Sequence, residues 1–514
     1  MSDIKSSEHS AIQDRLIESP ANPSLLPTLN CFPSSVRHIH LMGICGTGMA
    51  ALAGMLKANG YHVTGSDANI YPPMSVFLAQ IGIPVYSGYS PDNLIPRPDL
   101  VIVGNVVTRK NPEAIALADC RLPYVSFPQA LNHYFLSGKT SLVIAGTHGK
   151  TTTSSLLATL LHKAMLNPGF LIGGLLQDFG RNYHIGTGQY FVVEGDEYDT
   201  AFFDKGPKFL HYNPHIAVIT SIEFDHADIY RDLDAVKQSF KRLVEIMPAN
   251  GCLIACLDDP VVSETVKDAQ CEVQGYGLQE NAKWVLADLQ VDVSGTSFSI
   301  YREGELFGKF MNPMPGRHNA LNALAVIALL DHIGISQAAV RKDLETFKGV
   351  KRRQEVRGIV RGITVIDDFA HHPTSVRETL AALKAAYKGH RLLAVFEPRT
   401  NSSRRAVFQK DYTLSFDNAD LIIVKEPIAL PNILQTERFS APQLVTDLCQ
   451  RGIVAHYFSA TDDILDYLER AAGKGDVIVI LSNGGFDNIH QRLLERLATT
   501  APSCGPMVGG TPLY

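Results

Sequence analysis

A glycine-rich segment that follows a short apolar run carries the residue types that bind phosphates: Gly146-Thr-His-Gly149-Lys-Thr-Thr152. In such a loop, backbone N–H groups surround phosphate oxygens at the start of a helix, the lysine reaches the terminal phosphates and a threonine hydroxyl binds Mg²⁺. The usual pattern, G-x-x-x-x-G-K-[ST], would begin with a glycine at Ile144, so the segment departs from the strict form there and Gly146 supplies the flexible position. We predict ATP binding, rather than a plain helix start, through Gly146, Thr147, His148, Gly149, Lys150, Thr151 and Thr152.

Acidic residues and a histidine follow the next two apolar runs. The first run ends at Glu194-Gly-Asp-Glu-Tyr-Asp199, and the second is followed by Glu223-Phe-Asp-His226. Carboxylates gathered at one strand end repel each other without a cation, and Mg²⁺ prefers oxygen ligands. A lone histidine is more often structural, but this one follows a strand of the same sheet as the phosphate loop. We therefore predict Thr151, Glu194 and His226 as metal ligands.

A second glycine-rich turn lies nearer the N-terminus. Residues 38–42 are apolar and lead into Gly43-Ile-Cys-Gly46-Thr-Gly48-Met-Ala-Ala51, which fits the form G-x-G-x-x-G/A. Glycines there let a pyrophosphate approach the start of a helix, and Asp67, after the next apolar run, can accept a hydrogen bond from a ribose hydroxyl. NAD is the default ligand, UDP-sugars also carry a pyrophosphate, and a turn that binds nothing is the alternative. The candidate residues are Gly43, Gly46, Thr47, Gly48, Met49 and Asp67.

The elements that position these residues are short apolar runs alternating with helical patterns. That alternation indicates βαβ units with parallel sheets, in which ligands bind at the carboxyl ends of the strands. We predict an α/β protein with a Rossmann-like N-terminal domain, a central P-loop ATPase-like domain with a parallel sheet, and a Rossmann-like C-terminal domain. The expected boundaries are a flexible arm at 1–35, domains at 36–137, 138–356 and 357–499, and a flexible tail at 500–514.

Composition narrows the function classes. The chain has 514 residues, with 46 basic and 52 acidic side chains and a net charge of -6. Without a basic excess, nucleic acid is not an expected partner. No apolar run approaches the roughly 18 residues of a membrane helix, and the polar N-terminus lacks a signal peptide, so we expect a cytoplasmic protein with no membrane partner. The eight cysteines form no CxxC pair, which gives no zinc-site spacing.

Seven motifs in order make the sequence recognisable between about residue 38 and residue 497. They are GICGTGM, GTHGKTTT, VVEGDEYD, IEFDHAD, GRHNALNA, RRQE and DDFAHHPT. Taken together, they resemble those of the Mur ligase family of peptidoglycan enzymes. The resemblance implies an ATP-dependent ligase that activates a carboxylate as an acyl phosphate, with Mg²⁺ as cofactor and UDP-N-acetylmuramate as one substrate.

The resemblance also implies roles for single residues. The turn at 43–48 would bind UDP, Lys150 would hold the γ-phosphate, Thr151 and Glu194 would hold one Mg²⁺ and His226 a second, Asn319 and Asn322 would contact adenine, Arg353 would touch the phosphates from a hinge, and Asp368 would face the nucleotide. Some members carry a carbamylated lysine after the metal histidine. Phe240 fills that position here, with Lys241 beside it, and we expect no carbamate.

Several segments favour the branch of the family that attaches a ready-made tripeptide, L-alanyl-γ-D-glutamyl-meso-diaminopimelate, in peptidoglycan recycling. They are GSDAN at 65–69, YPPMS at 71–75, FFDK at 202–205, EPR at 397–399 and SNGGF at 482–486. The residues expected to contact the peptide are Arg399, Ser482, Asn483, Gly484, Gly485 and Phe486. A branch that adds free L-alanine is the alternative.

Two other classes compete with a ligase. A nicotinamide-dependent dehydrogenase would use the first glycine turn but would leave the phosphate loop and its acidic strands unexplained. A non-catalytic nucleotide-binding regulator is the other. We expect a monomer or a weak homo-oligomer; the sequence decides neither this, nor the tolerated peptide length, nor the general base, nor any modification of Lys241.

Overall fold

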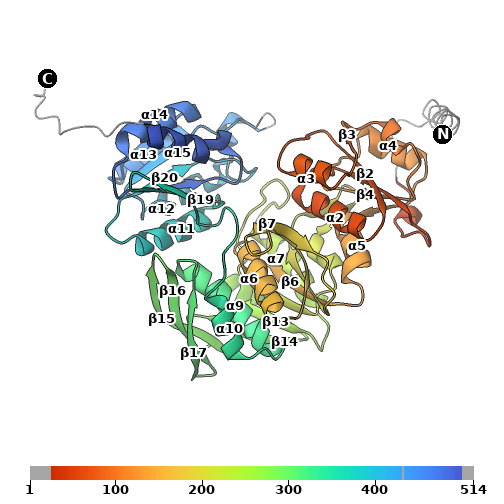
Figure 1. Cartoon of the computed structure of the whole chain (residues 1–514), viewed down its shortest axis with the longest axis horizontal. Helices are drawn as coiled ribbons and strands as arrows, with labels where there is room; N and C mark the ends of the chain where they lie inside the picture. Colours follow the sequence, from red (N-terminus) through yellow and green to blue (C-terminus); the bar gives the residue numbers. More distant parts are fainter. Residues whose placement is uncertain (1–24, 431–432, 500–514) are drawn as a thin grey trace, which may run out of the picture. The chain divides into compact units, whose positions relative to one another are not determined.

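The computed structural model describes residues 25–430 and 433–499. The greater part of the expected arm, residues 1–24, and the expected tail, residues 500–514, lie outside the described residues. The chain divides into two compact units, residues 1–351 and 352–514, which are described separately (Figure 1). No helix among the described residues is long and apolar enough to cross a membrane.

The first sheet, red to orange in Figure 1, is five-stranded and wholly parallel, in the order β3-β2-β1-β4-β5. It forms because apolar strand residues alternate with Ala/Leu-rich helices that can be buried on a wide face. The strands are β1 (His38–Met42), β2 (His62–Asp67), β3 (Val85–Ser87), β4 (Leu100–Val103) and β5 (Tyr124–Ser126), and the helices are α2 (Thr47–Ala58), α3 (Met74–Gln80), α4 (Pro112–Asp119) and α5 (Phe127–Leu131).

Residues 25–35, which the sequence assigns to the flexible arm, are described and include a short 3-10 helix, η1 (Pro27–Leu29). Leu25 and Leu29 pack against a buried cluster of this domain that contains Tyr124. The ring of Phe32 stacks on His133 with centroids 3.8 Å apart. These residues are ordered because their apolar side chains are buried. The polar composition of the surrounding segment gave no indication of this burial.

The second sheet is ten-stranded, in the order β17-β16-β15-β14-β13-β12-β6-β9-β7-β8. Its strands from β7 to β15 pair in parallel, whereas β16, β17 and β8 pair antiparallel at the edges, so the predicted parallel sheet carries antiparallel extensions. The strands are β6 (Thr140–Ala145), β7 (Gly169–Leu176), β8 (Arg181–His184), β9 (Tyr190–Gly195), β12 (Ile216–Ile219), β13 (Cys252–Cys256), β14 (Glu272–Gly277), β15 (Trp284–Asp292), β16 (Gly295–Arg302) and β17 (Glu305–Asn312).

Helices cover both faces of this sheet because alternate strand residues point to opposite faces. Leu142 and Ile144 of β6 pack with α6 (Lys150–Lys163), α9 (Arg317–His332) and α10 (Gln337–Leu344). Val143 and Ala145 belong instead to the cluster that holds α7 (Leu233–Glu245), α8 (Pro260–Thr265) and α2 of the first domain.

A small hairpin joins the first two domains within this unit. It is formed by β10 (Asp199–Ala201) and β11 (Asp204–Pro207), directly after the acidic segment that follows β9. Phe202 and Phe203 at its tip pack against the N-terminal domain, and the ring of Phe203 meets that of Tyr124 edge-on at 4.8 Å.

The second unit, blue-green to blue in Figure 1, holds a six-stranded sheet in the order β18-β19-β23-β20-β21-β22. All its pairs are parallel except β18 with β19. The unit begins at Arg352, ahead of the boundary expected at 356/357, because β18 already pairs with β19. Its strands are β18 (Glu355–Val360), β19 (Ile363–Asp368), β20 (Leu392–Phe396), β21 (Leu421–Lys425), β22 (Ala455–Phe458) and β23 (Val477–Leu481), and its helices are α11 (Pro373–Ala386), α12 (Gln409–Ser415), α13 (Ala441–Gln450), α14 (Thr461–Ala471) and α15 (Ile489–Thr499).

Candidate active site

The phosphate loop joins β6 to α6 through two glycines in conformations that other residues rarely adopt. Gly146 has φ +131 and Gly149 has φ +80. A Cβ on Gly146 would lie 2.1 Å from Oγ1 of Thr220, and one on Gly149 would lie 2.6 Å from Oδ1 of Asn322. Gly149 is the N-cap of α6 and has no side chain to cap this helix, which is the arrangement in which a helix start binds a phosphate through its first N–H groups.

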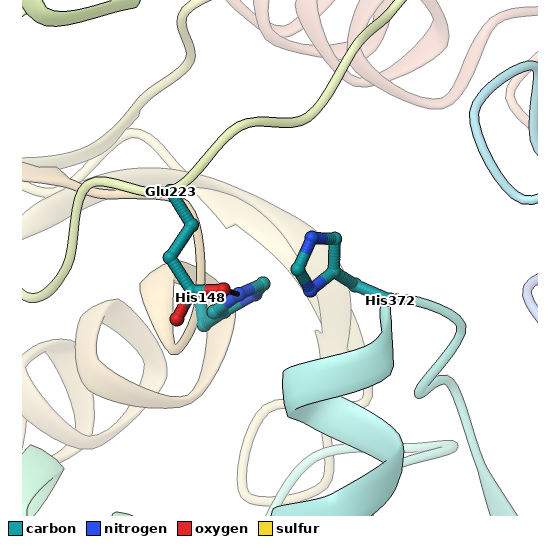
Figure 2. A group of neighbouring side chains, drawn as sticks. All are labelled: His148, Glu223 and His372. Carbon is teal, nitrogen blue, oxygen red and sulfur yellow. Dashed lines mark ion pairs between the residues drawn. The ribbon is translucent and has the colours of Figure 1, made fainter. Parts of the chain in front are cut away.

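The loop is fastened to the segment that follows β12. Oγ1 of Thr220 donates to the carbonyl of His148 at 2.5 Å, and the N–H of Thr147 donates to the carbonyl of Ser221 at 2.9 Å. Nε2 of His148 lies 3.3 Å from Oε2 of Glu223, and Figure 2 shows the two side chains meeting. These contacts hold the loop in place before any ligand binds, which reduces the cost of ordering it.

Lys150 lies in a buried position and is matched by carboxylates. Its Nζ donates to Oε2 and Oε1 of Glu197 at 2.9 and 3.2 Å, and to the carbonyl of Gly146 at 2.5 Å. Burial alone would lower the pKa of Lys150, but Glu197, Asp196 and Glu194 raise it on balance. The lysine is therefore a fixed positive charge at the start of α6, where a transferring phosphate needs one.

Glu197 connects this lysine to the predicted metal histidine. Its side chain is only 2% exposed, and Oε1 lies 3.2 Å from Nε2 of His226. Burial would raise the pKa of Glu197, but Lys150 and His226 lower it on balance, so the group is a carboxylate. The sequence places Glu197 in the acidic segment without a role, and only the distances reveal that it links two predicted site residues.

His226 is held in an unusual backbone conformation, with φ +54. Its ring packs against that of Tyr198 with centroids 3.9 Å apart. Burial would lower the pKa of His226, but hydrogen bonding to Glu197 and the charge of Asp225 raise it. A strained, partly buried and ion-paired histidine beside a phosphate loop fits a functional role better than a purely structural one.

Glu194 and Thr151 both adjoin a pair of glycines on β7. The N–H of Gly173 donates to Oε1 of Glu194 at 2.8 Å. A Cβ on Gly174 would lie 2.6 Å from Cγ2 of Thr151. The close approach of the β7 backbone therefore places the carboxylate at the end of β9 and the first turn of α6 in one neighbourhood.

The two asparagines predicted to contact adenine are buried on α9. Asn322 abuts the phosphate loop at Gly149. Nδ2 of Asn319 donates to the carbonyl of Pro315 at 2.8 Å, so part of this amide already supports the start of its own helix. Of the pair, Asn322 is the one that the geometry ties to the phosphate loop.

The N-terminal glycine turn leads into α2, whose N-cap Gly46 also lacks a side-chain cap. Gly43 has φ +80, and a Cβ there would lie 3.0 Å from Cγ2 of Val106. Thr47 and Gly48 form the first turn of α2, followed by Met49, which is buried. Oδ2 of Asp67 accepts the N–H of Cys45 at 2.9 Å, so this carboxylate is tied to the turn itself.

In the second unit, Asp368 ends β19 and is buried. Its Oδ2 accepts the N–H of Gln354 and its Oδ1 accepts the N–H of Ala370, both at 2.8 Å. Burial raises the pKa of Asp368, although Arg353 acts in the opposite direction. The guanidinium of Arg353 lies 4.8 Å from the centroid of Phe369.

The residues expected to contact a peptide form one connected group with two exceptions. Oγ of Ser482 donates to Oε2 of Glu397 at 2.6 Å and accepts the N–H of Gly484 at 3.0 Å. A Cβ on Gly484 would lie 2.1 Å from Cδ of Arg399, so the arginine packs directly on the glycine. Asn483 lies in this turn, with Oδ1 shielded from solvent and without a hydrogen bond to any described residue.

Phe486 and Gly485 are the exceptions. The Phe486 side chain is fully buried in the core of the second unit, so it supports the turn from beneath and does not face a ligand. Around Gly485 a Cβ would meet nothing within 4 Å. Arg352, which the sequence analysis did not single out, donates from Nη2 to the carbonyls of Ser482 and Gly484 at 2.6 and 2.7 Å and so fixes the same turn.

A second group of potential metal ligands, Cys252, Glu272 and His332, lies at the amino ends of β13 and β14, away from the phosphate loop. Burial and the carboxylate of Glu272 raise the pKa of the Cys252 thiol to about 12. A metal needs the thiolate, so Cys252 is better explained as a buried thiol of the core than as a metal ligand.

Comparison with known proteins identifies the class to which this fold and site belong. Three family models match: the Mur ligase family, catalytic domain over residues 38–137, the Mur ligase middle domain over 144–330, and the Mur ligase, glutamate ligase domain over 352–484. The chain belongs to the Mur ligase family, and it is an ATP-dependent ligase that forms a carbon–nitrogen bond.

Individual relatives indicate which members of the family this chain resembles in sequence and structure. The chain is 40% identical, over 90% of its length and 99% of the relative's, to the UDP-N-acetylmuramate–L-alanyl-γ-D-glutamyl-meso-2,6-diaminoheptandioate ligase of Escherichia coli K12. It is 33% identical, over 89% and 97% of the lengths, to a UDP-N-acetylmuramate–L-alanine ligase of Caldanaerobacter subterraneus. The crystal structure of a murein peptide ligase from Psychrobacter arcticus superposes with a TM-score of 0.68 at 36% identity, covering 90% of this chain and 99% of that one.

Replacing Gly146 with alanine should distort the phosphate loop. The added Cβ would collide with Thr220, so we expect ATP affinity, measured by calorimetry, to fall at least about tenfold, with a loss of about 1–3 kcal/mol in the free energy of unfolding. Gly304→Ala is the matched control, because Gly304 has φ +84 but no atom within 4 Å of the added Cβ. Equal ATP affinity in Gly146→Ala and the control would contradict this account of the loop.

Replacing Glu197 with glutamine should leave Lys150 and His226 without their shared negative charge. Removing one partner of a buried ion pair costs about 3–5 kcal/mol, which denaturant titration would detect. Because the pKa of Glu197 is lowered from 4.5, its stabilisation is present at neutral pH and is lost as the pH falls through the folded-state pKa. The difference between the variant and wild type should therefore shrink in acid.

Asp199→Asn is the control for Glu197→Gln. Asp199 pairs with Lys205, whose side chain is 67% exposed, and exposed pairs contribute at most about 1 kcal/mol. If the two variants lost the same free energy of unfolding, Glu197 would not be the buried counter-charge described above.

Proposed function

We propose that the protein joins the amine of L-alanyl-γ-D-glutamyl-meso-diaminopimelate to the carboxylate of UDP-N-acetylmuramate, with ATP converted to ADP and phosphate, in peptidoglycan recycling. The observation that carries the proposal is the buried Lys150 ammonium at a glycine loop, matched by carboxylates at the neighbouring strand ends. The relatives named above supply the identity of the two joined substrates. The use of ATP as co-substrate supports a cytoplasmic location for the reaction.

We propose that each of the three sheets contributes residues to substrate binding. We assign UDP to the turn at 43–48 with Asp67, and ATP to residues 146–152 with Asn319, Asn322, Arg353 and Asp368. The peptide is assigned to Arg399 and the turn at 482–485, with Phe486 as support. These assignments suit a three-domain division of the chain, and we propose a monomer or a weak homo-oligomer.

The chemistry requires an activated carboxylate. A carboxylate oxygen of the muramate attacks the γ-phosphorus and ADP leaves, which gives an acyl phosphate. The peptide amine then attacks the acyl carbon, and the tetrahedral intermediate loses phosphate while the nitrogen loses a proton. Lys150 and the helix start at Gly149 neutralise charge that develops on the transferred phosphate, so positioning and electrostatics account for the rate.

The residues around the phosphate loop fit a divalent cation. Thr151 and Glu194, which adjoin the same glycine pair, offer oxygen donors of the kind that Mg²⁺ prefers, and His226 offers a nitrogen donor. When bound there, Mg²⁺ would neutralise phosphate charge. Phe240, in contrast, is buried at 0% exposure against Phe209, so its position supports the expectation of no carbamate.

Replacing Lys150 with alanine should abolish ligation and leave UDP-N-acetylmuramate binding intact, because the UDP turn belongs to a different sheet. Loss of one charged contact to the transferred phosphate should cost about 2–4 kcal/mol in the transition state. ADP release and calorimetric binding of UDP-N-acetylmuramate would measure the two effects. Lys342→Ala, on exposed α10, is the control, and ADP release at the wild-type rate by Lys150→Ala would refute the assignment.

The choice of amine substrate should favour the tripeptide. We expect kcat/KM for L-alanyl-γ-D-glutamyl-meso-diaminopimelate to exceed that for free L-alanine by at least about 100-fold, because a site that pairs with charged groups rejects a substrate lacking them. A coupled ADP assay with both amines tests this. A higher kcat/KM for L-alanine would place the chain with the L-alanine-adding relatives instead.

A further inference from the structure

A cavity in the second unit, lined by both apolar and charged side chains, lies apart from Asp368 and from the turn at 482–485. Its volume is about 270 Å³, and its lining includes Arg404, Glu426, Arg438 and Tyr457. Glu426 directly follows β21, and Tyr457 belongs to β22. The cavity therefore sits by the carboxyl ends of the two strands at one side of the sheet, where ligands of parallel sheets bind.

Two guanidinium groups of this cavity are fixed by backbone carbonyls. Nη1 of Arg404 donates to the carbonyl of Ile428 at 3.1 Å, and Nε donates to that of Thr400 at 3.3 Å. Nε of Arg438 donates to the carbonyl of Ile433 at 2.9 Å. Within the described part of the chain, the terminal nitrogens of Arg438 make no hydrogen bond, so they are available to an anion.

Two positively charged side chains, those of Arg404 and Arg438, line this cavity. Burial and the nearby Arg399 lower the pKa of Arg404. Arg438 reaches the same place because its backbone pairs with that of Arg405. None of the ion pairs found among the described residues neutralises Arg404 or Arg438, and guanidinium groups held in place are suited to bind a carboxylate.

Glu426 adds a negative charge to the same lining. Its N–H donates to the carbonyl of Phe458 at 2.8 Å, which fixes the backbone at the end of β21. Its Oε2 is shielded from solvent and meets no hydrogen-bond donor at hydrogen-bonding distance in the described residues, while the Tyr457 phenol, whose pKa is raised by burial and by the Glu426 carboxylate, lies beside this carboxylate. A buried carboxylate oxygen without a partner is costly, and an ammonium group would satisfy it.

The position along the sheet matches the length of the peptide substrate. The strand order β19-β23-β20-β21-β22 places the cavity about 14–19 Å from the end of β19, since neighbouring strands lie about 4.8 Å apart. An extended chain spans about 3.5 Å per residue, and the γ-glutamyl link and the long third side chain extend it further. Under the proposed function Asp368 faces the nucleotide, so a tripeptide whose amine lies at this end of the sheet and whose chain passes Arg399 is long enough to reach the cavity.

The geometry points to this cavity as the subsite for the far end of the diaminopimelate residue, whose carboxylate is bound by Arg404 and Arg438 and whose ammonium is bound by Glu426. The inference rests on the proposed function and extends it by naming the groups that recognise the third residue. It also explains why both signs of charge line one cavity: the end of this residue carries both.

Three peptide acceptors distinguish the contribution of the far carboxylate from that of the far ammonium. The tripeptide with diaminopimelate carries both, the tripeptide with L-lysine in its place keeps the ammonium but lacks the carboxylate, and the dipeptide L-alanyl-γ-D-glutamate lacks both. Arg438→Gln should lower kcat/KM about 10–100-fold for the diaminopimelate peptide alone, chiefly through KM. Glu426→Gln should lower it for both tripeptides and leave the dipeptide unchanged.

The dipeptide rate reports that each variant is folded and catalytically competent. Arg470→Gln, which removes an exposed arginine on α14, is the control for lost charge and should change none of the three rates. Equal losses on all three acceptors, or no loss on any, would overturn the subsite. If instead the wild-type protein used none of the peptides, the proposed function would fail, an outcome distinct from failure of the subsite.

Discussion

The buried ammonium of Lys150 is the constraint on which the catalytic region depends. A charge taken out of water must be matched, and Glu197 matches it while also reaching His226. The same carboxylate can do so only if β9 and β12 end at neighbouring places in the sheet and if the loop at 146–149 can bend without side chains. The strand order, the glycines of the loop and the acidic segment all serve the same requirement, which is to match the charge of Lys150.

The requirement extends outward through backbone contacts. Thr147 and His148 are tied to the segment after β12, and Gly173 is tied to Glu194. In the second unit, Arg352 performs a comparable task by holding the carbonyls at 482 and 484. In both units, the loops that follow strands are held by hydrogen bonds in which at least one partner is a main-chain group, which cannot change rotamer and so preserves the geometry.

The sequence predicts the architecture well where local pattern and tertiary burial agree. The apolar run at 38–42 coincides with β1. The glycine loop after β6 leads directly into α6, as the phosphate-loop motif predicts. The meander from β15 to β17 was not anticipated, although its alternating residues and the glycines near 295 and 304 were signals of antiparallel hairpins. The alternation of apolar runs with helical segments in the sequence indicated parallel strands. That alternation carries no information on antiparallel strands added at the edge of the sheet.

Single site residues are harder to predict because chemically similar neighbours compete. Asp196, Glu197 and Asp199 follow one strand, and only the folded distances show that Glu197 is the residue that contacts both Lys150 and His226. Phe486 illustrates the opposite case, since an aromatic residue beside a glycine turn suggests a binding loop and yet its side chain is in the core. Burial of that kind depends on packing against strands β19, β20 and β21, which are distant from Phe486 in the sequence and which no local pattern contains.

The hairpin of β10 and β11 limits which segments of this chain can be exchanged with those of a relative to make a chimera. Phe202 and Phe203 belong to the central domain by sequence, but they pack on the N-terminal domain beside Tyr124. A chimera that exchanged residues 38–137 alone would bring a foreign surface to this aromatic tip, a few residues from Glu197. The natural module for such an exchange is therefore discontinuous: the N-terminal domain together with the hairpin at 199–207.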